Sequence, residues 1–166
     1  ETQGPEGDES GADVAHRIYL DSLAKVSSFL APPRPTMLHQ KHVTILDLTQ
    51  FGIGDTYGQA LAATLGWMTH IQDIRLADNR LTDEGMGPII LAAVKIPNLL
   101  ELNLSKNEIG DVSSDALDTF LRDPNCTLQR LIMQTADVDD FEAEPFVDAV
   151  KENRSLLELD LTDNLI

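Results

Sequence analysis

The chain repeats one pattern of apolar and polar positions five times. The copies are VTILDLTQFGIGD, IQDIRLADNRLTD, LLELNLSKNEIGD, LQRLIMQTADVDD and LLELDLTDNLI. Successive copies start 28, 28, 29 and 28 residues apart, and three apolar columns stay in register through all of them. The columns are Leu46, Ile74, Leu102, Leu131 and Leu159; Leu48, Leu76, Leu104, Met133 and Leu161; and Ile53, Leu81, Ile109, Val138 and Ile166. A fixed period of this length indicates a solenoid of stacked repeats.

The first half of each copy predicts a short strand and a turn. In the Leu-x-Leu pair, apolar residues alternate as they do in a strand that buries one face. Asn79, Asn107 and Asn164 follow three residues later. A buried amide there can bond backbone groups of the neighbouring turns. Phe51 and Ala136 replace this asparagine in the first and fourth copies, so we expect those two turns to be less regular.

The second half of each complete repeat predicts a helix with two apolar columns one turn apart. These columns are Leu61, Ile89, Leu117 and Phe146, followed by Leu65, Ala93, Leu121 and Val150. An aspartate near the start of each helix is placed to cap it: Asp55, Asp83, Asp111 and Asp140. Stacked repeats of this kind place a parallel sheet on the concave, inner curve and the helices on the convex, outer curve.

The region before the repeats predicts a tail and a cap. Residues 1–12 are acidic, glycine-rich and free of large apolar residues, which predicts a disordered tail. Residues 13–39 predict an N-terminal capping helix over 13–30, capped by Asp13, and a proline-rich connector. Residues 40–166 hold about 4.5 repeats of 28–29 residues. Because the last copy stops after its strand, we expect a longer repeat protein, truncated here at its C-terminal end.

These repeats carry a family resemblance. The pattern L-x-x-L-x-L-x-x-N-x-I/L, followed by a long helix, is similar to the ribonuclease-inhibitor-like leucine-rich repeats. The junction DPNCTLQRL at 123–131 is especially similar to the helix-to-strand junctions of that family. The resemblance covers residues 40–166 and implies an α/β horseshoe. Such repeats serve immune sensors, inhibitors, GTPase-activating proteins and actin regulators, so the resemblance specifies the fold rather than one function.

The net charge restricts the partners. Twelve basic residues against 28 acidic ones give a net charge of −16. This charge repels nucleic-acid phosphate and anionic lipid, so we expect neither nucleic acid nor membrane as a partner. If the charge selects a partner, that partner is a protein with a basic surface; alternatively, the charge only keeps the protein in solution. Cys126 is the single cysteine, which indicates a reducing, cytoplasmic setting.

The sequence offers no catalytic, metal or cofactor group. Gly52-Ile53-Gly54 resembles a dinucleotide-binding loop, but Ile53 belongs to a repeat column. His39 and His42 have no third metal ligand nearby, and no base stands beside Cys126 in the sequence. Trp67 is either an exposed interface anchor or a cover over Met68. We therefore expect a protein that is not an enzyme and that holds no cofactor.

The concave face is the predicted binding site. Acids outnumber bases there by five to two when the positions flanking each core leucine are counted. The predicted partner-binding residues are Asp47, Asp73, Arg75, Glu101, Asn103, Arg130, Ile132, Glu158 and Asp160. The leading hypothesis is a protein–protein interaction module of a larger intracellular scaffold or sensor. The alternative is a GTPase-activating protein, with Arg75 as its central basic residue, or an actin-regulating protein.

Overall fold

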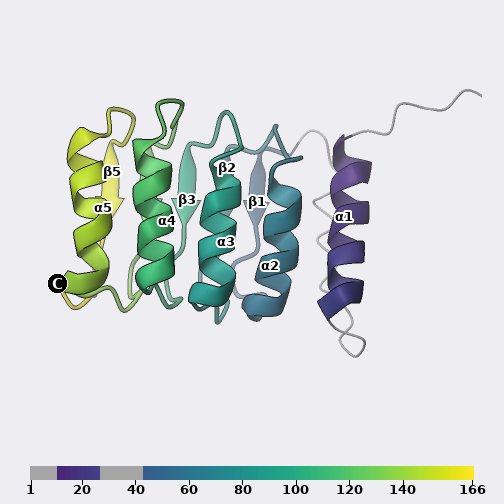
Figure 1. Ribbon diagram of the computed structural model, residues 1–166, viewed down its shortest axis with the longest axis horizontal. Helices are drawn as coiled ribbons and strands as arrows, with labels where there is room; N and C mark the ends of the chain where they lie inside the picture. Colours follow the sequence, from purple (N-terminus) through teal and green to yellow (C-terminus); the bar gives the residue numbers. More distant parts are fainter. Residues whose placement is uncertain (1–10, 27–42) are drawn as a thin grey trace, which may run out of the picture.

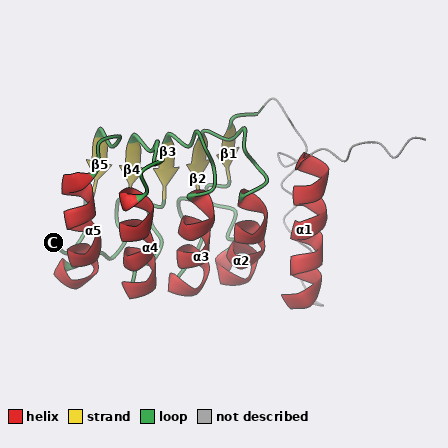
Figure 2. Ribbon diagram, turned by 45° about the horizontal axis from the view of Figure 1, so that its top comes forward, coloured by secondary structure: helices red, strands yellow, loops and turns green. Residues whose placement is uncertain are grey.

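The computed structural model has two layers, a row of helices and a parallel sheet (Figures 1 and 2). It describes residues 11–26 and 43–166. The predictions for the proline-rich connector and for most of the N-terminal tail lie outside the described residues. The helices are α1 (Gly11–Val26), α2 (Gly54–Leu65), α3 (Asp83–Ala93), α4 (Asp111–Arg122) and α5 (Asp140–Glu152). The strands are β1 (Ile45–Asp47), β2 (Asp73–Arg75), β3 (Glu101–Asn103), β4 (Arg130–Ile132) and β5 (Glu158–Asp160).

The sheet confirms the predicted repeat register. Its five strands are parallel and lie in chain order, β1 to β5. The central residues pair directly across the sheet: Leu46, Ile74, Leu102, Leu131 and Leu159. The extra residue of the 29-residue repeat lies outside the strands and does not disturb this pairing. Because neighbouring strands are about 4.8 Å apart and packed helices about 8–10 Å apart, the row must curve with the sheet on its inner side.

The predicted apolar columns form the core. Ile74, Leu102 and Leu131 are fully buried, and so are Leu76, Leu104 and Met133 behind them. The helices contribute Leu61, Ile89, Leu117 and Phe146, each at most 2% exposed. At the fifth repeat Leu159 and Leu161 are partly exposed, and Ile166 is 58% exposed.

The N-terminal helix lies beside the first repeat. Helix α1 contacts α2, and its Tyr19 is buried. Burial, together with the neighbouring Tyr57 of α2, raises the pKa of Tyr19 to about 12. The helix begins at Gly11, two residues before the predicted start, so residues 11–12 are helical rather than part of a tail. Asp13 therefore lies in the first turn, where its charge complements the helix dipole.

None of the four aspartates predicted as caps stands at the N-cap position of its own helix. The residues at the N-cap positions of α3, α4 and α5 are Thr82, Gly110 and Asp139. Asp83 instead caps the helix of the following repeat: its carboxylate accepts hydrogen bonds from the N–H groups of Gly110 (3.0 Å), Val112 (3.0 Å) and Ser113 (2.9 Å). Asp83 is the first residue of α3, but the close stacking of the repeats brings its carboxylate to the start of α4.

Asp55 also reaches the next repeat, where it bonds the N-cap residue of α3. Its two carboxylate oxygens accept from the N–H and the hydroxyl of Thr82, at 2.8 and 2.9 Å. Gly85 permits this approach, since a Cβ there would stand 2.8 Å from the Cα of Asp55. A larger residue at this position would force α2 and α3 apart.

The buried asparagines also act on the preceding repeat. The Asn107 Oδ1 accepts from the N–H groups of Asn79 (3.0 Å) and Leu81 (3.1 Å) in the turn before it. The Asn164 Oδ1 does the same for Ala136 and Val138. A repeat that lacks the asparagine therefore leaves the turn of the preceding repeat, rather than its own turn, without an acceptor.

The backbone angles of the turns show this displacement. The fourth turn, which contains Ala136, has left-handed residues at Thr135 and Asp137, like Asp78 and Arg80 of the second turn. The prediction of an irregular fourth turn was thus wrong, because the asparagine that serves that turn is supplied by the fifth repeat. The first turn does differ, because Gly54 is left-handed where the corresponding Thr82 of the second turn is extended.

Candidate functional site on the exposed sheet face

The helices cover one side of the sheet and leave the other side open (Figure 2). We call the outward side chains of the five strands the sheet face. They form two columns across the strands. The columns are Ile45, Asp73, Glu101, Arg130 and Glu158, and Asp47, Arg75, Asn103, Ile132 and Asp160. The structure thus brings all nine predicted partner-binding residues onto one surface.

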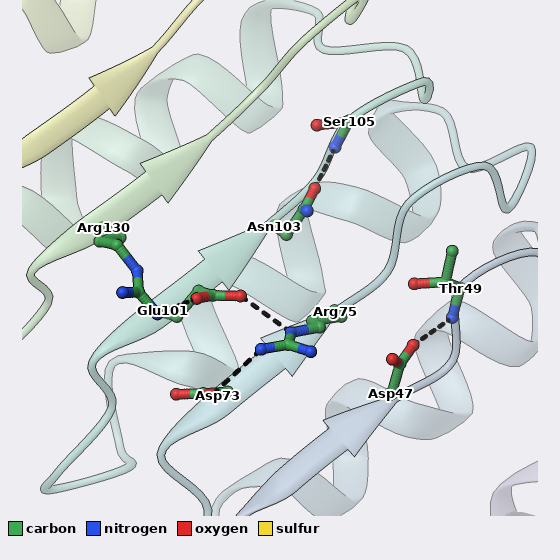
Figure 3. Close-up of polar contacts among 8 residues, drawn as sticks. All are labelled: Asp47, Thr49, Asp73, Arg75, Glu101, Asn103, Ser105 and Arg130. Carbon is green, nitrogen blue, oxygen red and sulfur yellow. Dashed lines mark hydrogen bonds and ion pairs between the residues drawn. The ribbon is translucent and has the colours of Figure 1, made fainter.

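The centre of the sheet face is an ion-pair network across three strands (Figure 3). The Arg75 guanidinium lies 2.9 Å from the Glu101 carboxylate and 3.4 Å from the Asp73 carboxylate. Arg130 pairs with the other oxygen of Glu101 from the far side. The Glu101 side chain is only 7% exposed. Two acids and two bases therefore cancel, and the middle of the face carries no net charge.

Protonation follows this geometry. Burial raises the pKa of Glu101, but the hydrogen bonds from Arg130 and Arg75 lower it by more, so its pKa lies below the usual value. The hydrogen bond to Glu101 raises the pKa of Arg75. Arg75 and Glu101 thus each stabilise the charged form of the other.

The two ends of the sheet face keep their negative charge. Asp47 stands on β1, and Glu158 and Asp160 stand on β5; none of the three forms an ion pair within the described residues. Asp47 and Asp160 each accept a hydrogen bond from the N–H two residues later, at 3.0 and 2.9 Å. Asn103 makes the same bond at 3.1 Å, so this strand-end turn needs an acceptor rather than a charge (Figure 3).

Sequence reasoning identified nine of the ten members of the sheet face but not its charge pattern. The count of five acids to two bases predicted an acidic strip, whereas the structure shows a neutral centre between acidic ends. Pairing across strands depends on side-chain rotamers, which repeat spacing does not specify. Ile45, which is 37% exposed, was missed because its column is otherwise polar.

The other candidates from the sequence are placed as follows. Trp67 is half exposed, whereas Met68 beside it is buried. Cys126 is half-buried in a hollow of about 600 Å³ at the ends of α4 and α5, 3.6 Å from the Ser155 hydroxyl. Gly52 and Gly54 flank the buried Ile53 in the first repeat turn.

The described residues contain neither a metal-binding cluster nor a membrane-spanning helix. No group of histidine, cysteine and carboxylate side chains in this part of the chain is arranged to hold a metal ion. Nor does any helix there have the length and apolar character needed to cross a bilayer.

Comparison with known proteins identifies the class. The family model described as Leucine Rich repeat matches residues 68–89, 95–117 and 152–166. The ribonuclease inhibitor of Sus scrofa is 32% identical over 94 residues, which are 57% of this chain and 21% of that protein. The human NACHT, LRR and PYD domains-containing protein 14 is 30% identical over 154 residues, which are 92% of this chain and 14% of that protein.

A solved structure has the same architecture. The structure titled Leiomodin-1 Actin-Binding Site 2 matches 95% of this chain and 80% of its own, with a TM-score of 0.59 at 18% sequence identity. The fold and the repeats thus define a leucine-rich-repeat solenoid. Its repeats are leucine-rich repeats similar to those of ribonuclease inhibitor, and the chain spans 14% to 21% of the length of the two relatives above.

Proposed function

We propose that this chain is a non-catalytic protein-binding module, which works in the cytoplasm and holds its partner on the sheet face. The observation that carries the proposal is a polar face built from five consecutive strands and left open by the helices. The similar ribonuclease inhibitor is, by its name, a protein directed at an enzyme. Neither nucleic acid nor a membrane suits a chain with a net charge of −16.

The charge pattern describes the partner. A basic group placed over β1 meets Asp47, and one placed over β5 meets Glu158 and Asp160. Four strand spacings separate the two ends by roughly 19 Å, since neighbouring strands are about 4.8 Å apart. A partner that uses both ends must be a macromolecule with two basic groups at this separation and a less charged surface between them. Its association should weaken with added salt.

A neutralised variant tests the role of the face. Asp47→Asn, Glu158→Gln and Asp160→Asn together remove three charges and keep the two turn acceptors, as Asn103 shows. The matched control removes three exposed helix acids: Glu84→Gln, Asp115→Asn and Glu144→Gln. Affinity capture from a cell extract with wild type and both variants, at low and high salt, measures the difference. Partners lost with the face variant but retained with the control would support the proposal, and equal retention would refute it.

Actin binding is a second candidate. It rests on the similarity to the actin-binding structure of leiomodin-1, which extends over 95% of this chain. Co-sedimentation with actin filaments and a binding assay with monomeric actin test it directly. The GTPase-activating alternative relied on Arg75, whose guanidinium is engaged by Asp73 and Glu101. GTP hydrolysis by a partner GTPase, with wild type and with Arg75→Ala, tests that role.

A further inference from the structure

The ladder of buried asparagines is interrupted at one turn. Ala136 stands where an asparagine would accept the backbone N–H groups of the third turn. The Ile109 N–H instead donates a hydrogen bond to the carbonyl of Ala136, at 3.1 Å. The N–H of Asn107 has no acceptor within the described part of the chain, although Asn107 is only 6% exposed. A nearly buried donor without an acceptor is costly unless water or a ligand supplies one.

A hollow of about 440 Å³ lies at this turn. We call it the turn hollow, and its lining includes Arg80, Lys106, Asn107, Glu108, Thr135 and Asp137. Arg80 and Lys106 are exposed, and each occupies a left-handed backbone position, with φ of 57° and 55°. Neither forms an ion pair among the described residues, whereas Arg75, Arg122, Arg130 and Lys151 all do.

We propose that the turn hollow binds a carboxylate presented by a protein partner, as an Asp or Glu side chain. Arg80 and Lys106 supply charge-assisted hydrogen bonds, and the Asn107 N–H supplies a third donor. Glu108 and Asp137 line the same hollow and balance the two cations, so a singly charged group fits better than a doubly charged phosphate. This site lies at the strand-to-helix turns and is independent of the sheet face.

Amide chemical shifts of the ¹⁵N-labelled chain test the proposal. The probes are three blocked tripeptides with glycines flanking glutamate, glutamine or phosphoserine. We expect the glutamate peptide to shift the Asn107 N–H along a saturating curve and the glutamine peptide to leave it unmoved. Shifts that do not saturate, equal binding of the glutamine peptide, or tighter binding of the phosphoserine peptide would each overturn the proposal.

Variants separate this site from the rest of the surface. Lys106→Gln should weaken binding of the glutamate peptide by about two- to fivefold. The change keeps the backbone, because Gln50 holds the same left-handed position in the first turn. Arg80→Gln should act similarly. Lys95→Gln, an exposed cation outside the hollow, is the control and should change nothing. If the neutralised sheet-face variant lost the glutamate peptide as well, the assignment to the turn hollow would be wrong.

Discussion

Two neighbouring repeat junctions in this protein use different polar contacts on the same apolar frame. Between the second and third repeats, Asn107 and Asp83 cross the boundary, with five and three hydrogen bonds to or from the main chain. Six of these eight bonds cross the boundary, and the other two hold the Asn107 amide against the carbonyls of Leu104 and Ser105 in its own repeat. Between the third and fourth repeats, Ala136 occupies the asparagine position.

The third–fourth junction replaces one of these contacts with a local one. Asp139 caps its own helix, accepting from the N–H groups of Phe141 and Glu142, while the Glu142 carboxylate accepts from the Asp139 N–H. The strands nevertheless pair in the same register on both sides. The apolar columns are therefore enough to set the register, and the polar contacts add stability that differs from junction to junction.

Removing the asparagine of the stronger junction should have the largest effect. Asn107→Ala leaves the buried N–H groups of Asn79 and Leu81 without their acceptor, and should lower the free energy of unfolding by about 3 kcal/mol. Urea denaturation followed by circular dichroism measures the change. Asn103→Ala, which removes one half-buried turn acceptor, is the control and should cost less than about 1 kcal/mol.

The two aspartates at equivalent positions should differ. Asp83→Ala removes the cap of α4 and should cost about 1–2 kcal/mol in unfolding free energy. Asp111→Ala should cost less than about 0.5 kcal/mol, because α5 is capped by its own Asp139. Equal losses in the two variants would show that the difference between the junctions does not depend on these caps.

An asparagine at position 136 should make the third–fourth junction more like the second–third junction in stability. In Ala136→Asn the new Oδ1 can accept from the Asn107 N–H, which should raise the free energy of unfolding by about 1 kcal/mol. The same change should weaken glutamate-peptide binding in the turn hollow, since it occupies a donor. Thermal unfolding measures the first effect. A destabilised variant would mean that the third turn has closed around the alanine.

The smallest expected effect is on the free energy of unfolding at low pH, where Asp83 becomes protonated. Burial raises the pKa of Asp83, but Ser113 and the N–H groups of Val112 and Gly110 lower it by more, so its folded-state pKa lies below the usual value. Its contribution is complete above the unfolded-state pKa of about 3.9 and is lost as pH falls through the lower folded-state value. Asp83→Asn should therefore flatten the dependence of stability on pH below about pH 4, as followed by urea denaturation at a series of pH values.

The sequence alone determined the repeats, their register and all but one of the sheet-face residues. Because the columns of Leu46 and Leu48 and their equivalents recur every 28 or 29 residues, stacking the repeats buries these columns together, and side-chain alternation then assigns the outward positions. Local chemistry also indicated a buried amide at each Asn and a carboxylate near each helix start. Periodicity is a property of the chain itself, so it can be read without coordinates.

Only the tertiary structure decided which partner each polar group serves. Asp83 and Asn107 bond the adjacent repeat, and Glu101 pairs with arginines of both neighbouring strands. These bonds form because stacking places residues 26–31 positions apart within hydrogen-bond distance. The residues in these contacts are close in space although they are far apart in the sequence. For this reason the charge pattern of the sheet face and the unfilled donor in the turn hollow became visible only once the repeats were packed together.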